Sequence, residues 1–453
     1  MSQNLPPVRI VVLNFNGAGR IEQCLESLSK TLYPDLRVTV VDNASTDNSV
    51  ALVSREFPSV ELIENGANLG FSRGNNRALR VSDEPYVGLL NPDTVVDPDW
   101  LKPLVRRLNE DCLAGGVAPK ILHLYDRLPI RLEAPEFVPR GPDVRRLGVR
   151  IYGLKSDAGQ ADVTAGAYGV EKDDNGHAFR WSMKSVDLSL PVVSGSGVVR
   201  VELAGGDGRH GVPVKIFVGS REIGRLELDP ERTTNEIYFD ADVVYASARP
   251  AIESAGISPL PDGSMRDRGT NLLEGVPWSA WDSSAFDNRC EIFAPKGAAV
   301  LYRRDMLAGL DYLDDGIFMY YEDADLAWRA RRRGWRFYYE PASVVRHEHA
   351  VFSKEWSPGF IRNVEFGKLR MLAKNAPVLW ALRHMAASAK HVWNDARAGV
   401  LQLDAASMAL SLSRARALTQ VVVAAPNTFK LRANEARLAP LDGRELNAFL
   451  EPQ

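Results

Sequence analysis

Short apolar runs alternate with segments of helical spacing over the first 120 residues. In the helical segments, apolar residues recur every three or four positions: IEQCLESLSKTL, STDNSVALVSREF and GFSRGNNRALRV. The apolar runs are rich in β-branched residues, which is typical of buried strands, and they span residues 8–13, 36–41, 60–64 and 86–90. This alternation predicts an α/β fold with a parallel sheet.

Polar residues follow each of the four predicted strands. In an open parallel sheet, ligands bind outside the carboxyl ends of the strands, so these residues are candidates for a binding site. They are Asn14 and Asn16, Asp42 and Asn43, Asn65 and Asn68, and Asn91 with Asp93.

The hydrophobic pattern changes beyond residue 123, where a proline-rich connection begins. Between residues 179 and 239 apolar and polar residues alternate and are separated by glycine and proline turns, which predicts an antiparallel β-sandwich. The α/β pattern then resumes, and the last segment has basic residues among apolar ones at helical spacing. We expect a first α/β half at 1–123, an insert at 124–254 with the sandwich at about 176–242, a second α/β half at 255–370 and a helical region at 371–453.

The composition restricts the class of protein. The chain has 453 residues, 45% of them hydrophobic, and a net charge of −3, so neither a nucleic-acid partner nor a disordered acidic chain is indicated. Its three cysteines, Cys24, Cys112 and Cys290, are far apart, which argues against a disulfide framework or a cysteine zinc site. Neither a signal-peptide pattern nor a long apolar run is present, and we expect a cytoplasmic protein.

The stretch VGLLNPDTVVDPDW contains the first candidate for chemistry. Pro92 has no N–H and restricts Asn91, so the strand is expected to end there and to leave Asp93 at its carboxyl end. A carboxylate in that position suits Mg²⁺ or Mn²⁺, which prefer oxygen ligands and take some of them from substrate phosphates. The alternative is a simple turn, since all of these residues favour turns.

Two further stretches follow the second and third predicted strands. Asp42 is placed to accept the N–H of a nucleotide base, whereas Ser45 and its neighbours are explained by capping of the next helix. Arg73 lies among Gly66, Gly70 and Gly74, which leave room for close approach of the backbone. Neither a dinucleotide-binding G-x-G-x-x-G nor a P-loop is present.

Acidic and histidine residues form the last two candidates. Glu322, Asp323 and Asp325 precede a helix that ends in arginines, which suits the helix dipole; alternatively, one acid is a general base for an incoming hydroxyl. His347 and His349 lie two apart on an extended segment and share a face, so either could complete a site around Asp93. A zinc site would need further ligands.

Together these stretches resemble glycosyltransferase family 2, the inverting enzymes of the GT-A fold, and within it bacterial rhamnosyltransferase-like members. The similar segments lie in the family's order within residues 8–120 and 255–370: VVLNFNG, VVDNASTDNS, NLGFSRGNN, LLNPDTVV, GAAVLYRR, FMYYEDADLAWRARRRGW and VVRHEHA. The resemblance implies a GT-A domain, a Rossmann-like nucleotide-diphospho-sugar transferase fold, interrupted by the β-sandwich-like insert and followed by helices.

The resemblance also implies roles for individual residues. Asn-Pro-Asp stands where most GT-A enzymes have Asp-x-Asp, so Asn91 replaces the first acid and Asp93 is the implied ligand of Mg²⁺ or Mn²⁺. His347, or else His349, completes the metal site, and Asp323 is the implied general base. Gly297, Ala298 and Glu322 would lie on the acceptor side, and the donor would contact Asn14, Asn16, Asp42, Asn68, Arg73, Asn91 and Asp93.

The implied function is transfer of a sugar, with inversion, from a nucleotide-sugar donor to a hydroxyl of a glycan or lipid-linked glycan in bacterial surface polysaccharide assembly, with dTDP-rhamnose the favoured donor. The alternative is a non-catalytic glycan-binding or scaffold protein with a degenerate transferase fold. A processive synthase is disfavoured because the chain has no Q/R-x-x-R-W element, and a glycosidase because nucleotide-binding features are present.

The insert departs from the compact family pattern, and the C-terminal helices lie beyond the similar segments. In the insert, Trp181 and Tyr238 would stack on sugar rings if it binds glycans; packing or an oligomer contact is the alternative. The C-terminal helices carry Trp380, Arg383, Lys390 and Trp393, which suit a peripheral contact with a membrane surface, although packing on the catalytic domain is the commoner use of such helices.

Overall fold

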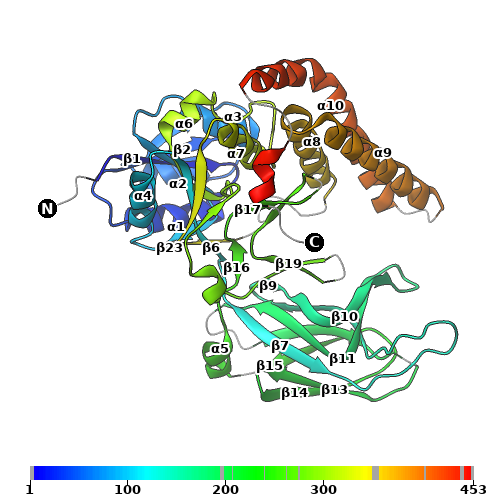
Figure 1. Cartoon of the computed structure of the whole chain (residues 1–453). Coiled ribbons are helices and arrows are strands. Elements are labelled where there is room, and N and C mark those ends of the chain that lie inside the picture. The colour runs from blue at the N-terminus through cyan, green and yellow to red at the C-terminus, as the bar shows by residue number, and fades with distance from the viewer. Residues whose placement is uncertain are drawn as a thin grey trace. The chain divides into compact units, whose positions relative to one another are not determined.

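The computed structural model describes residues 5–193, 198–206, 208–238, 240–261, 263–273, 276–348, 357–401, 405–438 and 443–449. The chain divides into two compact units (Figure 1). Unit 1 comprises residues 1–121, 254–268 and 284–453, and unit 2 comprises residues 122–253 and 269–283. The predicted second α/β half at 255–370 is therefore not continuous, because residues 269–283 belong to unit 2.

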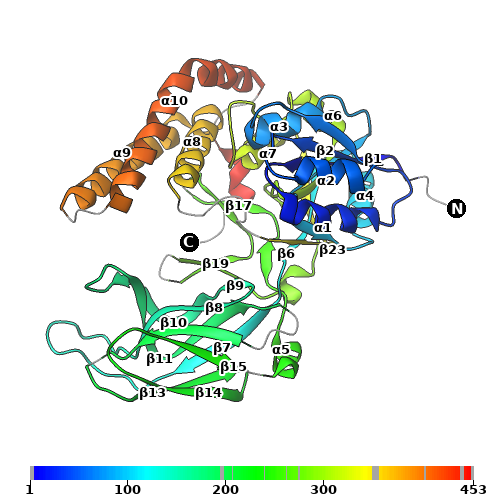
Figure 2. The ribbon, with the colours of Figure 1, turned by 180° about the vertical axis from the view of Figure 1, so that it is seen from behind.

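Four parallel strands form the first part of the sheet in unit 1, in the order β3-β2-β1-β4. They are β1 (Val8–Asn14), β2 (Leu36–Asp42), β3 (Glu61–Glu64) and β4 (Tyr86–Leu90). The crossover helices are α1 (Ala18–Ser29), α2 (Ser49–Glu56) and α3 (Gly70–Leu79), and Figure 2 shows them from behind. All four strands coincide with the predicted apolar runs, and the predicted mixed α/β fold is confirmed.

Further strands extend this sheet in the antiparallel sense. β22 (Ala299–Arg303) runs antiparallel to β4 and to β6 (Ala114–His123). β23 (Arg336–His347) pairs antiparallel with β21 (Cys290–Ile292) and with the short β5 (Thr94–Val96). The pairing with β5 sets His347 opposite Thr94, which brings the end of β23 to the segment that follows β4.

The core of this sheet is built from the inward-facing apolar residues of β1 and β2 and from α4 (Leu101–Glu110). Ile10, Val12, Val40 and Leu104 are fully buried, and Trp100 is almost completely buried. Burial on both faces of a parallel sheet explains why these strands are continuous apolar runs.

The remaining elements of unit 1 surround the last strands. They are β17 (Ile257–Pro259) and β18 (Met265–Asp267), which form a hairpin, η1 (Ser284–Phe286), α6 (Arg304–Gly309), α7 (Glu322–Arg332), α8 (Pro358–Asn375), α9 (Val378–Leu401), α10 (Ala405–Leu438) and η2 (Arg444–Phe449). α8 packs against α7 and α10, and α9 packs against α10. The C-terminal helices thus belong to the same unit as the sheet.

Unit 2 is an antiparallel sheet in the order β14-β13-β7-β11-β8-β12-β15, with β10 paired to β11 and β9 to β8. Its strands are β7 (Arg127–Glu133), β8 (Arg150–Ser156), β9 (Gly159–Gln160), β10 (Asp162–Lys172), β11 (Ala178–Pro191), β12 (Val198–Ala204), β13 (Val212–Val218), β14 (Arg221–Leu228) and β15 (Thr233–Tyr238). The unit also contains α5 (Ala241–Ser247) and the hairpin of β19 (Thr270–Leu273) and β20 (Val276–Ser279), and β16 (Ile252–Ser254) lies at its boundary.

The sheet of unit 2 differs from the predicted sandwich in two respects. Its strands begin at Arg127 rather than near residue 176, and those described are connected in one nine-stranded sheet instead of two separate sheets. The edge strands β14 and β15 lie close together, since a Cβ on Gly224 would come within 3.3 Å of Ile237 Cγ2. A curled sheet therefore encloses the apolar cluster of this unit.

The two aromatic residues proposed to stack on sugars have different surroundings. Trp181 packs edge-on against Phe137 and Phe179, with ring centroids 5.8 and 5.5 Å apart. Tyr238 is 67% exposed on β15, and its hydroxyl donates to Glu236. Trp181 therefore has the contacts of a packing residue, and a sugar contact through Tyr238 stays a prediction.

Candidate active site

A cavity of about 480 Å³ opens in unit 1 where β1 and β4 end. One wall comes from the strand ends and another from the β17–β18 hairpin and the segment before β22, and the N-terminus of α7 closes a third side. Most of the predicted site residues line it: Asn68, Asn91, Asp93, Gly297, Ala298, Glu322, Asp323 and His347. These residues come from five distant parts of the sequence.

Asn14 and Asp42 do not line the cavity, because they bond to each other beneath it. Both are 1% exposed, and Asn14 Nδ2 donates to Asp42 Oδ1 over 2.8 Å and to Ser49 Oγ over 2.8 Å. Asp42 also accepts from the Ser45 hydroxyl (2.6 Å) and backbone N–H (2.9 Å). These residues fix the loop after β2, and the predicted contact between Asp42 and a nucleotide base stays a prediction.

The prediction that Ser45 caps the next helix is wrong. α2 begins at Ser49 after Asn48, and the Ser45 hydroxyl donates to Asp42 instead. Asn16 holds the same loop, since its side-chain oxygen accepts from the Thr46 N–H over 2.7 Å and its own backbone is left-handed, with φ of 53°. Asn16 thus joins the loop after β1 to the loop after β2.

Of the three glycines near Arg73, Gly70 and Gly74 serve close packing within the protein, whereas a Cβ on Gly66 would meet nothing within 4 Å. Gly70 has φ of +76°, and a Cβ there would lie 2.4 Å from the Phe318 carbonyl oxygen. Asn43 donates to the Gly70 carbonyl over 3.0 Å, and Asn68 accepts from the Gly70 N–H over 3.0 Å. Arg73 itself is exposed and does not line the cavity.

Asp93 and His347 face each other in the cavity wall. His347 Nε2 lies 3.1 Å from Asp93 Oδ1 and 3.3 Å from Asn91 Nδ2, and Asp93 and His347 are only 6% and 5% exposed. Within the described residues, Asp93 Oδ1 is buried without a hydrogen bond of proper geometry. A buried carboxylate oxygen without such a bond, next to an imidazole nitrogen, fits a divalent cation that takes further ligands from water and phosphate.

Within the part of the chain that the structure describes, Asp93 and His347 are the candidate donors for a metal. Among the residues that the structure describes, no group of three or more His, Cys, Asp or Glu side chains is arranged to hold an ion. His349, the alternative ligand, lies outside the described residues. A cation held at Asp93 and His347 would therefore depend on the substrate for most of its other ligands.

Asp323 lies at the first turn of α7, on the other side of the cavity. Its Oδ2 accepts the Gly297 N–H over 3.0 Å and its Oδ1 accepts the Ala324 N–H over 2.7 Å. Burial raises its pKa to about 6, although these two backbone bonds oppose the increase. A carboxylate with that pKa is ionised at neutral pH and remains basic enough to accept a proton.

Glu322, the adjacent residue, has a different protonation state. It is 6% exposed, and burial, together with the charge of Asp323, raises its pKa to about 8. Its Oε2 is buried and has no hydrogen bond to any residue that the structure describes. At neutral pH Asp323 is thus ionised and Glu322 is protonated. Active sites with two carboxyl groups commonly separate their roles in this way, with one group acting as the base.

Sequence reasoning missed a charged pair near Asp323. Lys296 Nζ lies 3.1 Å from Asp267 Oδ2, and both side chains line the cavity. The charge of Asp267 raises the pKa of Asp323, and that of Lys296 lowers it. Asp267 follows the insert in an irregular stretch of sequence, where no periodic pattern marks it as a site residue.

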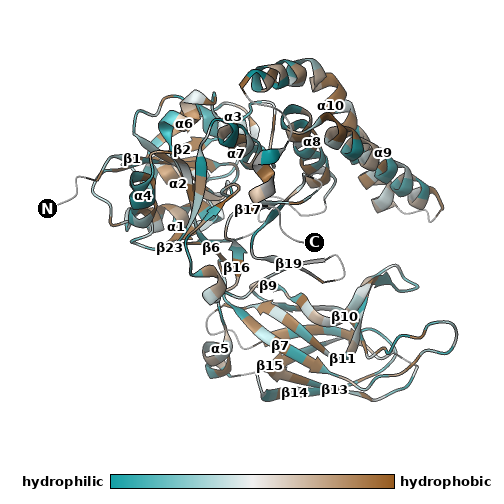
Figure 3. Ribbon diagram, in the orientation of Figure 1, coloured by the Kyte–Doolittle hydropathy of each residue, from teal (hydrophilic) through white to brown (hydrophobic). Residues whose placement is uncertain are grey.

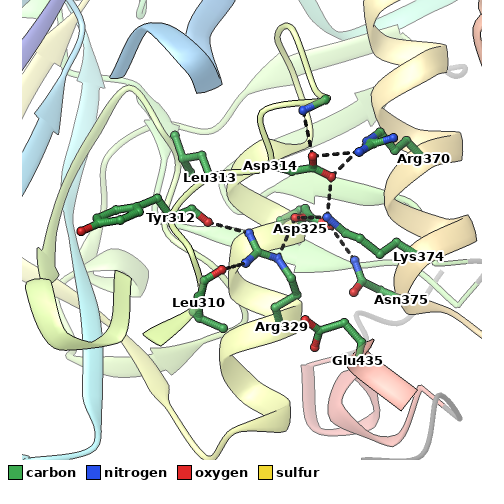
Figure 4. Close-up of polar contacts among 12 residues, drawn as sticks. Leu310, Tyr312, Leu313, Asp314, Asp325, Arg329, Arg370, Lys374, Asn375 and Glu435 are labelled. Carbon is green, nitrogen blue, oxygen red and sulfur yellow. Dashed lines mark hydrogen bonds and ion pairs between the residues drawn. The ribbon is translucent and has the colours of Figure 1, made fainter. Parts of the chain in front are cut away.

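A buried charge cluster fixes the helix that carries Glu322 and Asp323 (Figure 4). Lys374 of α8 bridges Asp314 (2.6 Å) and Asp325 of α7 (2.8 Å). Arg370 donates twice to Asp314, and Asn375 donates to Asp325 over 2.7 Å. Burial opposes ionisation of Asp314, but Lys374 and Arg370 hold its pKa below the usual range.

The backbone before α7 is also held in place by α8. Tyr320 and Tyr321 are left-handed, with φ of 72° and 69°, which is uncommon for such bulky residues. A Cβ on Gly367 of α8 would lie 2.3 Å from the Tyr320 carbonyl oxygen, so only glycine fits there. Arg329 of α7 meanwhile donates to the carbonyl oxygens of Leu310 and Tyr312, which fixes the preceding turn (Figure 4).

Comparisons with known proteins give one family and several distant relatives. Residues 9–147 match the family Glycosyl transferase family 2. The chain is 25% identical over 158 residues to the uncharacterized glycosyltransferase YibD of Escherichia coli K12, covering 33% of this chain and 46% of that protein. It is 28% identical over 123 residues to the N-acetylglucosaminyl-diphospho-decaprenol L-rhamnosyltransferase of Mycobacterium tuberculosis, covering 25% of this chain and 40% of that protein. The alignments thus span less than half the length of these relatives.

Two solved structures are also similar at low scores. One is S. aureus TarS 1–349 in complex with UDP-GlcNAc, with 22% identity, a TM-score of 0.24, and coverage of 25% of this chain and 34% of that one. The other is GalNAc-T7 with UDP, GalNAc and Mn²⁺, with 11% identity, a TM-score of 0.44, and coverage of 82% of this chain and 48% of that one. At these scores neither structure bears on individual site residues.

Proposed function

Residues 9–147 match glycosyl transferase family 2, and on that premise we propose that the chain moves a sugar from a nucleotide-sugar donor to an acceptor hydroxyl with inversion. The observation that carries the proposal is the cavity itself. It has the Asp93–His347 pair on one side and the ionised Asp323 on another. A diphosphate binding site and a base on one cavity are what such a transfer requires.

In the proposed reaction, Asp323 accepts the proton of the acceptor hydroxyl as that oxygen attacks the anomeric carbon. The new C–O bond forms while the bond from the anomeric carbon to the diphosphate breaks, and the nucleoside diphosphate leaves with the bonding electrons. A single displacement inverts the configuration. A divalent cation at Asp93 and His347 would offset the negative charge of the departing diphosphate.

The chain's own residues orient both partners in this proposal. The Gly297 N–H holds the Asp323 carboxylate toward the cavity, and the Lys296–Asp267 pair beside it is available to acceptor hydroxyls. Phe15 and Asn43 line the cavity where β1 and β2 end, and we place the nucleotide base there. Asn68 and Asn91 then lie toward the donor and Ala298 toward the acceptor.

We propose dTDP-rhamnose as the donor and a glycan or lipid-linked glycan of the bacterial surface as the acceptor. Support comes from the mycobacterial relative, which is named as an L-rhamnosyltransferase. Because that relative is 28% identical over a quarter of this chain, the sugar has to be determined directly.

The test is release of nucleoside diphosphate from a panel of nucleotide sugars, with Mg²⁺, with Mn²⁺ and with a chelator. Parental protein is compared with Asp93→Ala and with Asp99→Ala, a matched control whose carboxylate is 69% exposed and paired with Lys102. We expect metal-dependent release from one donor, lost in Asp93→Ala and kept in Asp99→Ala. Equal activity in both variants would contradict the role of Asp93.

A non-catalytic glycan-binding protein is the second candidate, because Asn91 stands in place of an acid and the metal pair has only one carboxylate. This candidate predicts that a glycan binds without turnover of any donor. Absence of release across the panel, with glycan binding seen by calorimetry, would favour it.

A further inference from the structure

Exposed apolar side chains concentrate on two of the C-terminal helices. Of the 24 large hydrophobic residues that are exposed in the described parts of the chain, twelve lie on α9 and α10. Six belong to α9: Val378, Leu379, Leu382, Trp393, Val400 and Leu401. Isolated exposed apolar residues are ordinary, whereas a gathering of this size on two packed helices indicates an interaction surface.

The exposed residues of α9 form a single face. At 100° per residue, Leu379, Leu382, Trp393 and Val400 fall within roughly a 60° arc of the helix. Arg383, Lys390 and Arg397 are spaced by seven residues, are all exposed, and follow along one edge of that arc. Hydrophilic and hydrophobic residues alternate along α9 and α10 in the hydropathy colouring (Figure 3).

The charge of this surface is strongly positive. The described residues of α9 and α10 contain eight Arg and Lys residues and two acids, Asp395 and Glu435, which gives 8 − 2 = +6 within a chain of net charge −3. Both acids are already paired with arginines: Asp395 with Arg414, and Glu435 with Arg333 over 3.2 Å. Neither acid is therefore available to offset Arg383, Lys390 and Arg397.

We propose that the α9–α10 surface, defined as the exposed face of residues 378–401 and 405–438, docks onto an anionic phospholipid bilayer. A helix with apolar residues and a tryptophan on one face and cations along its edge suits the plane of a membrane interface. None of the helices in the described parts of the chain has an apolar stretch that would cross a bilayer. The contact is thus peripheral, with the helices lying along the lipid surface.

A second copy of the chain is the competing occupant of an apolar surface. A two-fold dimer through this face would bring the same patch of each subunit together, so the cations of one copy would face those of the other. An anionic lipid surface instead complements them. The inference rests on the surface alone, so it can fail while the proposed transferase activity stands, and the reverse is also true.

The test is co-sedimentation of the full chain with vesicles of phosphatidylcholine alone and of phosphatidylcholine mixed with phosphatidylglycerol. We expect binding to the anionic vesicles only, weakened by salt. The triple variant Arg383→Glu, Lys390→Glu, Arg397→Glu should lower the partition coefficient by roughly 100-fold or more, since each basic residue near an anionic surface contributes about a fivefold factor. The matched control is Lys155→Glu, Lys172→Glu, Lys215→Glu, which makes the same charge change at exposed positions of unit 2 and should bind as the parent does.

A second variant separates the apolar contribution from the charge. Trp393→Ser leaves every cation in place and should weaken vesicle binding about tenfold, because it removes a large apolar side chain from the interface. Nucleoside diphosphate release with a soluble acceptor should be unchanged in both variants.

Two results would overturn the proposal. One is absence of binding to the anionic vesicles, or binding that the triple reversal leaves unchanged. The other is a concentration-dependent dimer in sedimentation velocity that Trp393→Ser dissociates, which would assign the surface to a second copy of the chain.

Discussion

Glu322→Gln should stabilise unit 1 at neutral pH although it replaces a buried residue of the candidate site. Glu322 is protonated in the folded protein because burial and Asp323 raise its pKa to about 8, whereas its ordinary value is near 4.5. At pH 7 the unfolded chain ionises this group and the folded chain does not. Since a pKa difference of one corresponds to about 1.4 kcal/mol, folding loses roughly 3 kcal/mol at pH 7.

The sign of the effect follows from the direction of the shift. Below pH 4.5 Glu322 is protonated in both the folded and the unfolded state, and its raised pKa does not lower the stability. As the pH rises, the loss of folding free energy increases, and it reaches its full value above pH 8. Glutamine is neutral at every pH and has nearly the shape of a protonated glutamate. The variant should therefore match the parent at pH 4 and exceed it by about 3 kcal/mol at pH 7.

The assay is urea unfolding of parent and variant at several values of pH between 4 and 8. Glu84→Gln is the matched contrast, because burial opposes ionisation of Glu84 but Arg9 donates to both of its oxygens over 2.9 Å and lowers its pKa. That variant should be less stable than the parent at pH 7, and its deficit should shrink as the pH falls through the acid range. Two results would refute the reasoning. One is a difference in the free energy of unfolding between Glu322→Gln and the parent that does not vary with pH, and the other is a variant less stable than the parent at pH 7.

Three further predictions concern catalysis and the buried charge cluster. Asp323→Asn should lower kcat by about 10² to 10⁴-fold and leave donor binding by calorimetry unchanged, because only the proton acceptor is lost; parental turnover would exclude Asp323 as the base. The parental kcat/KM should increase with pH through about 6, since the ionised carboxylate is the active form, and a profile flat from pH 5 to 7 would contradict this assignment. Lys374→Met should destabilise the protein by about 3 to 5 kcal/mol in urea unfolding, because it removes the cation shared by buried Asp314 and Asp325, and a loss below about 1 kcal/mol would show that Arg370 and Arg329 suffice.

The sequence predicted the parallel half of the sheet well, because a run of β-branched residues that ends in turn-forming residues is a local signal. The same local signal placed Asn91 and Asp93 correctly at the end of β4. It could not distinguish Asp93, which faces the cavity, from Asp42, which lies beneath it, since both follow apolar strands. The difference arises from partners at a distance: Asp42 bonds to Asn14 of the neighbouring strand, whereas Asp93 meets His347, 254 positions later.

Unit 2 was harder to predict. Alternation of apolar and polar residues shows that a strand has one buried face, but it does not show which strands pair with each other. Pairings such as β7 with β11 and β13 join residues far apart in sequence, and the same alternating pattern is compatible with two facing sheets or with one curled sheet. The charged pair of Asp267 and Lys296 was missed for a related reason. Neither residue belongs to a periodic segment, and they become neighbours only after the chain has passed through unit 2.

α8 is linked to the candidate chemistry by its packing on α7 and by Phe360 and Val364, which line the cavity. Glu322 and Asp323 need a site dry enough to raise both pKa values, and a dry site requires that the start of α7 be held against the cavity. Its own sequence does not secure this, because two left-handed tyrosines precede the helix. α8 supplies the restraint with Gly367 against Tyr320 and Lys374 against Asp325. Truncation before α8 should therefore return the pKa of Asp323 toward its ordinary value and shift the rising limb of the pH profile to lower pH. α8 is thus part of the candidate site, because it holds the start of α7 and contributes Phe360 and Val364 to the cavity wall.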